Sequence, residues 1–166
     1  MKNSDKAISN FITATEQDPT WDEPFELLGQ IYAEKKDDIC LKYFDNAANA
    51  NPKNTSALNQ KAYYLKSTNR SKEASIIYES IVISNPQNAD ALYNLGVISY
   101  DLKDYLKALK TLNICIGIDP ANAKAYYMIG LCNKAMNKIV EAKTAFKTAM
   151  SLDENFEDAK REFNNI

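Results

Sequence analysis

Residues 85–98 read NPQNADALYNLGVI, and residues 119–132, further along the chain, read DPANAKAYYMIGLC. Both stretches place a proline after an amide or acidic residue, an asparagine two residues later, and a glycine eight residues after that. A fixed period of this length is typical of stacked structural units, none of which can bury a core alone. The sequence therefore predicts a repeat array. The same period relates Pro19, Pro52, Pro86 and Pro120, except that the interval from Pro19 to Pro52 is one residue shorter.

Each repeat is predicted to contain two helices. The first carries apolar residues at three- and four-residue spacing, as Leu92 and Leu95 show, which is typical of a helix buried on one face. The second carries a small residue and a large one four positions later, such as Ala108 and Leu112. The proline ends this helix, because it has no N–H to donate and restricts the residue before it. Alignment on the prolines divides the chain into residues 22–54, 55–88, 89–122 and 123–156.

Small residues at one register of the first helices predict close contact with the second helices. Glycine inside a helix costs about 1 kcal/mol relative to alanine, so its repetition indicates a packing reason. We also expect Asn54, Asn88 and Asn122 to cap the first helices, because an asparagine side chain accepts hydrogen bonds from free N–H groups there. The register holds Gly29, Ala62, Gly96 and Gly130.

The pattern resembles the tetratricopeptide repeat, which follows W-x2-L-G-x2-Y, then A-x3-F, then P, with the same period. The first unit is similar to it over residues 25–32, FELLGQIY, followed by Phe44, Ala47 and Pro52. The resemblance covers nearly the whole chain. It implies an all-α, right-handed α-solenoid of stacked helix-turn-helix units, with the first helices lining a concave surface.

Three positions depart from that motif. Lys61 replaces the usual leucine, so the first helix of residues 55–88 is expected to be the least well packed. Ser99 and Asn133 stand where the motif has tyrosine.

Both ends are predicted to be single helices. Residues 5–21 match the second-helix register and are expected to form the second helix of a partial repeat. Residues 157–166 are expected to form a solvating C-terminal capping helix with Phe163 turned inward. Two explanations stay open: a fragment of a longer array, and a natural chain with a degenerate cap.

The composition offers no catalytic apparatus. The chain of 166 residues has no histidine, which removes the commonest general base. Its 20 basic and 22 acidic residues give a net charge of −2, with no general attraction to nucleic acid. No phosphate-binding glycine motif or metal-binding loop occurs. We therefore expect no catalysis, no cofactor, no metal and no nucleic-acid partner.

Location is predicted from the cysteines and the apolar runs. Cys40, Cys115 and Cys132 lie at small or apolar positions, and one thiol is left over under any pairing, which favours a reducing, cytoplasmic compartment. No apolar run approaches the roughly 20 residues that a membrane span needs, and residues 1–5 lack the apolar core of a secretory signal. We expect no membrane insertion, although an upstream signal would be invisible in a fragment.

The candidate binding surface is the side of the first helices that the repeats leave free. Leu92 and Leu95 fix the core-facing side, so the adjoining stripe follows at i, i+4 and i+7. This stripe is acidic at one end, rich in tyrosine in the middle and basic at the other. Tyrosine suits recognition because it combines apolar area with a hydroxyl, although some of these tyrosines could instead pack between repeats. We call the set the first-helix stripe: Glu23, Glu26, Gln30, Asn59, Tyr63, Lys66, Asp90, Tyr93, Asn94, Val97, Tyr100, Lys124, Tyr127, Leu131 and Lys134.

The resemblance suggests one specific use of such a stripe. Some tetratricopeptide domains hold the C-terminal carboxylate of chaperones through Lys, Asn and Arg on three successive first helices. Asn94 and Lys124 match that set, but Asn59, Tyr63 and Met128 stand where Lys, Asn and Arg are needed. The sequence therefore argues against a chaperone carboxylate clamp. A different polar contact with a peptide stays open.

The predicted function is that of a non-catalytic scaffold that binds an extended or helical peptide segment of a partner protein. Two alternatives stay open: a head-to-tail homo-oligomer through the repeat ends, and the recognition arm of a larger enzyme complex. In the peptide-binding prediction, Tyr93 and Tyr127 anchor apolar side chains, Asn59 and Asn94 bond the peptide backbone, Lys124 and Lys134 attract acidic groups, and Glu23 and Glu26 favour a basic stretch.

Overall fold

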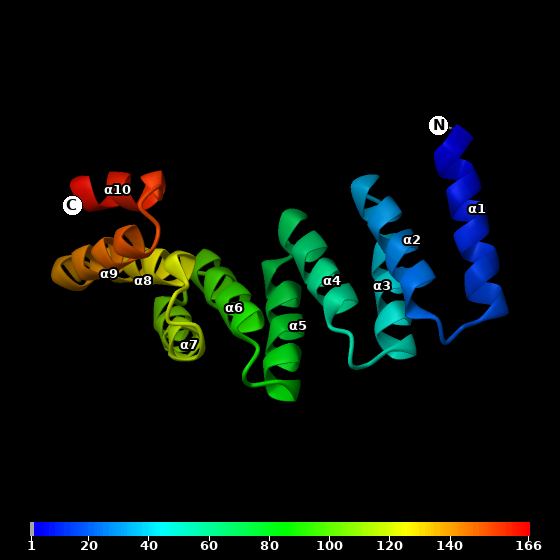
Figure 1. The fold of residues 1–166 in the computed structure, drawn as a ribbon, viewed down its shortest axis with the longest axis horizontal. Helices are drawn as coiled ribbons and strands as arrows, with labels where there is room; N and C mark the ends of the chain where they lie inside the picture. The colour runs from blue at the N-terminus through cyan, green and yellow to red at the C-terminus, as the bar shows by residue number, and fades with distance from the viewer. Residues whose placement is uncertain (1) are drawn as a thin grey trace. The chain divides into compact units, whose positions relative to one another are not determined.

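The computed structural model describes residues 2–166, with side chains from Asp5 onward. Within this range it contains ten α-helices joined by short turns and no β-strand (Figure 1). The prediction of an all-α fold is therefore confirmed. The helices are α1 (Lys2–Gln17), α2 (Asp22–Glu34), α3 (Ile39–Ala50), α4 (Ser56–Ser67), α5 (Ser71–Ser84), α6 (Ala89–Asp101), α7 (Tyr105–Ile118), α8 (Ala123–Ala135), α9 (Ile139–Leu152) and α10 (Glu157–Asn164).

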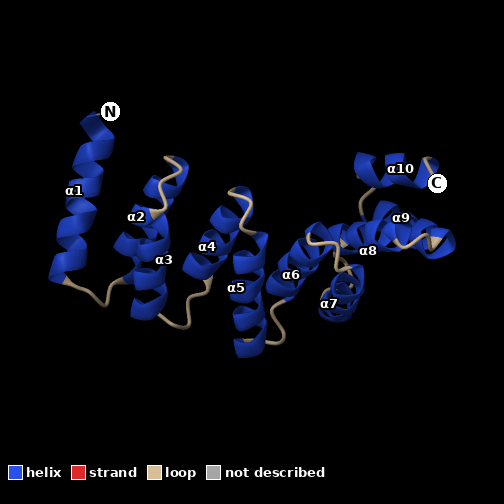
Figure 2. Ribbon diagram, turned by 180° about the vertical axis from the view of Figure 1, so that it is seen from behind, coloured by secondary structure: helices blue, strands red, loops and turns tan. Residues whose placement is uncertain are grey.

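The chain divides into two compact units, the first ending at Ile77 and the second spanning Tyr78–Ile166. In the first unit α2 packs against α3, and α1 and α4 flank this pair. In the second unit α6 pairs with α7 and α8 with α9, α7 also packs against α8, and α10 packs against α9 (Figure 2). First helices also touch each other within each unit, α2 with α4 and α6 with α8. Each unit is thus a stack of helix pairs.

The predicted glycine register brings the two helices of a repeat into contact. A Cβ atom built on Gly29 would lie 2.5 Å from Cε1 of Phe44, well inside the van der Waals distance. Phe44 is 1% exposed, so its ring fills the space that the missing side chain leaves. The same arrangement recurs as Gly96 with Leu112 and as Gly130 with Phe146.

Each repeat turns between its helices through one residue in the left-handed backbone region. In the third repeat, the N–H of Lys103 donates to Tyr100 O at 2.8 Å and the N–H of Asp104 donates to Ser99 O at 2.9 Å. The second of these bonds is typical of the Schellman motif that ends a helix. This backbone geometry recurs although glycine is used at none of the four turns: φ is 56° at Lys36, 62° at Asn69, 63° at Lys103 and 59° at Asn137.

Two of the three predicted asparagine caps are confirmed. Asn88 Oδ1 accepts from the N–H of Ala91 and Asn122 Oδ1 from that of Ala125, both at 2.9 Å. For Asn54 the predicted cap position was wrong, because the residue before α4 is Thr55, but the Asn54 side chain does accept from the N–H of the first residue of α4, Ser56.

Asn54 instead joins the start of α4 to the start of α2. Its Oδ1 accepts from the N–H of Ser56 at 3.0 Å, and its Nδ2 donates to Asp22 Oδ2 at 3.0 Å. The amide therefore links successive first helices, a role that local sequence does not reveal.

The departures from the motif are accommodated by polar partners. Lys61 Nζ lies 2.6 Å from Asp45 Oδ1 on α3, and its side chain is only 20% exposed. Ser99 is buried, and its hydroxyl donates to Leu95 O at 2.7 Å. Asn133 is buried as well, and the 2.8 Å bond from the N–H of Lys138 to its carbonyl is the turn bond that Ser99 also makes with Asp104, so it does not depend on the asparagine side chain.

The terminal helices are less deeply packed. In α1 the apolar residues Phe11 and Ile12 are only half-buried. In α10, Ala159 is fully buried, and Lys143 Nζ of α9 lies 5.8 Å from the ring centroid of Phe163. The ring of Phe163 therefore faces α9, as expected for a cap. The assignment of residues 5–21 to a partial repeat stays a prediction.

Candidate peptide-binding surface

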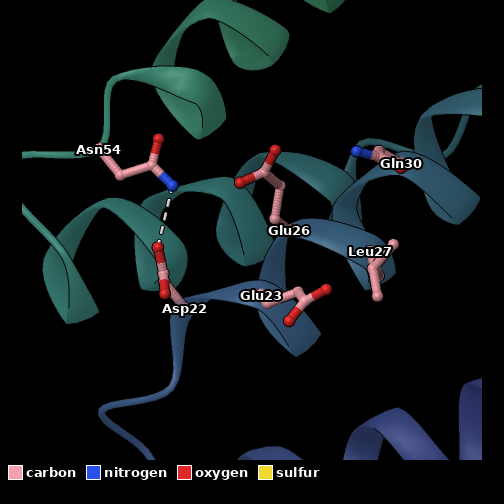
Figure 3. Close-up of a pocket in the computed structure, with 6 residues that line it drawn as sticks. All are labelled: Asp22, Glu23, Glu26, Leu27, Gln30 and Asn54. Atoms are coloured by element: carbon pink, nitrogen blue, oxygen red, sulfur yellow. Dashed lines mark hydrogen bonds between the residues drawn. The ribbon is translucent and has the colours of Figure 1, made fainter.

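The first unit has an open hollow of about 400 Å³ along α2. Residues 23, 26 and 30 share one helix face because they are spaced by three and four positions. Three of the lining side chains are carboxylates, so the hollow favours a cationic group. Figure 3 shows its lining, which comprises Asp22, Glu23, Glu26, Leu27, Gln30 and Asn54.

Glu26 is already engaged with the next first helix. Its Oε1 accepts a hydrogen bond from Ser56 Oγ at 2.5 Å and another from Gln60 Nε2, both on α4. These bonds hold α2 and α4 together within the first unit. One oxygen of this carboxylate is therefore already hydrogen-bonded within the chain and is less available to a ligand.

Asp22 is a lining residue that the sequence prediction missed. It accepts from Nδ2 of Asn54 and Nδ2 of Asn51, each at 3.0 Å. The Asn54 bond is the largest cause of a pKa below the ordinary range for Asp22. Its position could have revealed it, because carboxylates are favoured in the first turn of a helix and Asp22 lies in the first turn of α2. Glu23 is the exposed carboxylate of this hollow.

The α4 part of the stripe differs residue by residue. The side chain of Tyr63 is 73% exposed, and Lys66 is half-buried. Oδ1 of Asn59 is buried and has no hydrogen-bond partner among the residues that the structure describes.

The second unit carries a half-buried apolar and aromatic floor on α6 and α8. Its side chains pack against a core that includes Leu92, Cys115 and Cys132. The alternative that stripe tyrosines pack between repeats is therefore correct in part, because only a portion of each ring faces outward. Burial raises the pKa of each of these tyrosines. The floor consists of Tyr93, Val97, Tyr100, Tyr127 and Leu131.

Tyr127 and Lys134 also contact elements at the end of the chain. The Tyr127 ring centroid lies 5.0 Å from that of Phe156, just before α10, and 5.7 Å from that of Phe146. Lys134 Nζ lies 2.7 Å from Glu162 Oε2 on α10. Sequence analysis missed both contacts. The acidic group that Lys134 was expected to attract from a partner is supplied here by the chain itself.

The remaining polar members of the second-unit stripe lie at the edges of the floor. Asp90 and Lys124 are exposed in the first turns of α6 and α8, and Asn94 is half-buried. A ligand crossing the floor would thus meet an acid on one helix and a lysine on the next.

The cysteines do not form a reactive site. Cys40, Cys115 and Cys132 are free thiols and fully buried. Burial raises the pKa of Cys115 to about 11 and that of Cys132 to about 12, so both stay protonated at neutral pH. Over residues 2–166, no group of three or more Cys, Asp or Glu residues is arranged to hold a metal ion. Among the helices described, none has the length and apolar character needed to cross a bilayer.

Known proteins share this arrangement. Residues 67–149, half of the chain, match the family described as anaphase-promoting complex, cyclosome, subunit 3. The crystal structure of YrrB, a TPR protein with an unusual peptide-binding site, has a TM-score of 0.80 and 18% identity, and the match covers 96% of this chain and 83% of that one. The chain belongs to the tetratricopeptide repeat (TPR) family.

Two further comparisons are with a member of a protein complex and with a domain solved in complex with a peptide. The BBSome complex member bbs-4 of Caenorhabditis elegans is 26% identical over 139 residues, which are 83% of this chain and 30% of that protein. The chain thus spans less than a third of this relative. The first TPR of Spaghetti (RPAP3), solved bound to the HSP90 peptide SRMEEVD, has a TM-score of 0.63 and 23% identity, and the match covers 65% of this chain and 86% of that one. At these identities the structural likeness shows the fold alone.

Proposed function

We propose that this TPR chain is a non-catalytic interaction module that binds a peptide segment of a partner protein along the first-helix stripe. The observation that carries the proposal is the half-buried floor on α6 and α8, which includes Tyr93 and Tyr127. These rings are held by core packing, so a ligand can cover them with little further loss of side-chain freedom. Each 100 Å² of apolar area covered would contribute roughly 2.5 kcal/mol before the costs of association.

The relatives indicate the setting of this module. The matched family is described by a subunit of the anaphase-promoting complex, and bbs-4 is a member of the BBSome complex. Both descriptions name assemblies of many proteins. We infer that the partner segment belongs to another subunit of such an assembly, in the cytoplasm, where the three buried thiols would stay reduced.

A chaperone tail is not the ligand that we propose. The Spaghetti domain was solved with an HSP90 peptide, and that chemistry needs cations to hold carboxylates. Where a clamp needs Lys, Asn and Arg, this chain has Asn59, Tyr63 and Met128, and Met128 is buried. An apolar segment with one acidic group near Lys124 fits the second unit better. In the first unit, the carboxylates around the α2 hollow favour a lysine or arginine.

Binding can be located by photo-crosslinking from the exposed positions Tyr63 and Lys124, replaced one at a time by p-benzoylphenylalanine in the source cell. Both side chains lie on the stripe and are exposed, so the fold should tolerate the change. Lys42, exposed on the second helix α3, is the matched control. We expect one partner to be captured from both stripe positions and to be absent at Lys42. Capture from Lys42 with none from the stripe would refute the proposal.

The register of the terminal helices disfavours the alternative of head-to-tail assembly. Such a contact would place α1 of one copy behind α10 of another, as the second helix of a composite repeat. Phe11 then occupies the register of Phe146, and Asn164 occupies that of Gly130. Ala62 shows that one repeat accepts a Cβ at this register, but a Cβ at Gly130 would collide with the ring of Phe146, and asparagine is larger than alanine. We therefore expect a monomer, and light scattering that shows mass increasing with concentration would contradict this.

A further inference from the structure

The second unit has an apolar cleft that does not belong to the first-helix stripe. It is lined by residues of the second helices α7 and α9 and of the first helix α8, and it has a volume of about 300 Å³. Apolar side chains from all three helices line it, including Ile116 of α7, Ile129 of α8 and Val140 of α9. The other lining residues are Asn113, Tyr126, Glu141, Thr144, Ala145 and Thr148.

This cleft and the stripe lie on different sides of α8. Tyr126 and Ile129 face the cleft, while Tyr127 and Leu131 face the stripe. At about 100° per residue, the midpoints of these two pairs are roughly 150° apart around the helix axis. The second unit can therefore bind a ligand in the cleft without using any stripe residue.

Two of the exposed aliphatic side chains on the second helices of this unit share one register. Leu106 on α7 is 69% exposed and Val140 on α9 is 77% exposed. They occupy the same register in successive repeats, whereas Asp38 and Lys72 occupy it in the two preceding repeats. The array thus tolerates a charge at this position. Large aliphatic groups here do not serve the packing of the repeat, and Val140 lines the cleft.

Unpaired lysines stand beside the cleft. Lys110 lies one helical turn before Asn113, and Lys147 lies one turn after Thr144, so each adjoins a lining residue. Both are exposed, and neither takes part in an ion pair among the residues that the structure describes. The acidic member of the lining, Glu141, lies in the first turn of α9. The cleft therefore has a largely apolar lining with one carboxylate, and two lysines without an ion pair among the described residues lie one helical turn outside that lining.

We propose that this cleft is a second docking site, for an amphipathic segment of a partner protein with an apolar side chain flanked by acidic residues. The apolar side chain enters between Ile116, Ile129 and Val140. The acidic residues meet Lys110 and Lys147. A cleft of this volume holds one or two large aliphatic or aromatic side chains. Charge complementarity at its edges then favours a partner segment that carries negative charge. The proposal does not depend on peptide binding at the first-helix stripe.

The probe for this site is a synthetic 18-residue helical peptide with leucine on one face and glutamate on the other, labelled with fluorescein. Its matched control carries lysine in place of every glutamate. Fluorescence anisotropy is expected to show binding of the acidic peptide and at least tenfold weaker binding of the basic one. Lys110→Glu with Lys147→Glu should weaken the acidic peptide about tenfold, because two favourable charge contacts become repulsive. Lys42→Glu with Lys53→Glu, exposed in the first unit, should leave it unchanged.

Val140→Ser separates docking in the cleft from attraction by charge alone. Val140 is exposed, so its loss should leave the fold intact while weakening the peptide about fivefold to tenfold. In methyl NMR spectra of the protein, adding the peptide should shift the resonances of Ile116, Ile129 and Val140 and leave those of Leu131 and Val97 in place. Equal affinity for both peptides, unchanged binding by Val140→Ser, or shifts confined to Leu131 and Val97 would each overturn the proposal. Binding of anionic lipid vesicles that Val140→Ser leaves intact would assign the lysines to a membrane surface and overturn it too.

Discussion

Replacing Gly130 by alanine tests the close contact that defines the repeat. The new Cβ would meet Cε1, Cδ1 and Cζ of Phe146, the last of them at 2.8 Å, against about 3.5–4.0 Å for ordinary contact. Phe146 is fully buried, so the ring must move by roughly 1 Å where no space is free. Overpacking of this kind costs about 1–3 kcal/mol, while alanine gains about 1 kcal/mol in helix propensity. With a cost at the upper end of that range, about 3 kcal/mol, and the propensity gain subtracted, we expect the free energy of unfolding to fall by about 2 kcal/mol.

Gly117→Ala is the matched control within the same unit. Gly117 lies in α7, and a Cβ built there has no atom within 4 Å. The same substitution should therefore raise the free energy of unfolding by about 0.5 kcal/mol, because the propensity gain is unopposed near the helix end. Urea unfolding followed by circular dichroism at 222 nm measures both. If the two variants change stability in the same direction, the assigned role of Gly130 is wrong.

A double-mutant cycle with Phe146→Ala identifies the cause. Phe146→Ala alone should cost about 3–5 kcal/mol, because it empties a buried site. In the Gly130→Ala background it should cost about 3 kcal/mol less, since the whole clash disappears with the ring while the propensity gain remains. Additive effects would show that Gly130→Ala acts through something other than the ring of Phe146.

Three further measurements follow from the turns, the carboxylates and the thiols. Lys103→Gly is expected to raise the free energy of unfolding by about 1 kcal/mol, measured in urea, because Lys103 has a φ of 63° that disfavours L side chains. The pKa of Asp22 is lowered chiefly by Asn54. The stabilisation that Asp22 contributes is therefore present above its unfolded pKa of about 4 and is lost as pH falls through the folded value. In Asn54→Ala the free energy of unfolding should therefore fall less steeply with pH below about pH 4, as measured by urea titrations at a series of pH values. Cys115 and Cys132 should react with Ellman's reagent at neutral pH no faster than the chain unfolds, and a fast native-state reaction would contradict their burial.

The repeat could be predicted from sequence because its packing is local. Gly130 and Phe146 lie in adjacent helices of one repeat, and their register recurs along the chain. Asn88 and Asn122 cap the helices that immediately follow them, as short-range chemistry requires. The period and these local contacts were enough to place the helices and to identify the residues that join them.

The contacts between repeats could not be predicted in the same way. Asn54 reaches back 32 residues to Asp22, and Lys134 reaches forward 28 residues to Glu162. Which of several nearby partners a long side chain selects depends on its rotamer and on the angle between neighbouring helices, and the hydrophobic period fixes neither. A usable signal exists in the spacing, because Lys107 pairs with Glu79 at the same separation of 28 residues. Opposite charges at this separation in such an array are therefore candidates for ion pairs.

These contacts bear directly on what the stripe can recognise. A residue that joins neighbouring helices, such as Glu26 or Lys134, changes stability when it is mutated, so a loss of binding at that position has two possible causes. Exposed stripe residues, such as Tyr63 and Lys124, contribute little to the fold. Their substitution separates recognition from stability. If the chain binds a peptide as we propose, specificity should therefore be sought first at the exposed members, and the half-buried floor should supply affinity for an apolar segment.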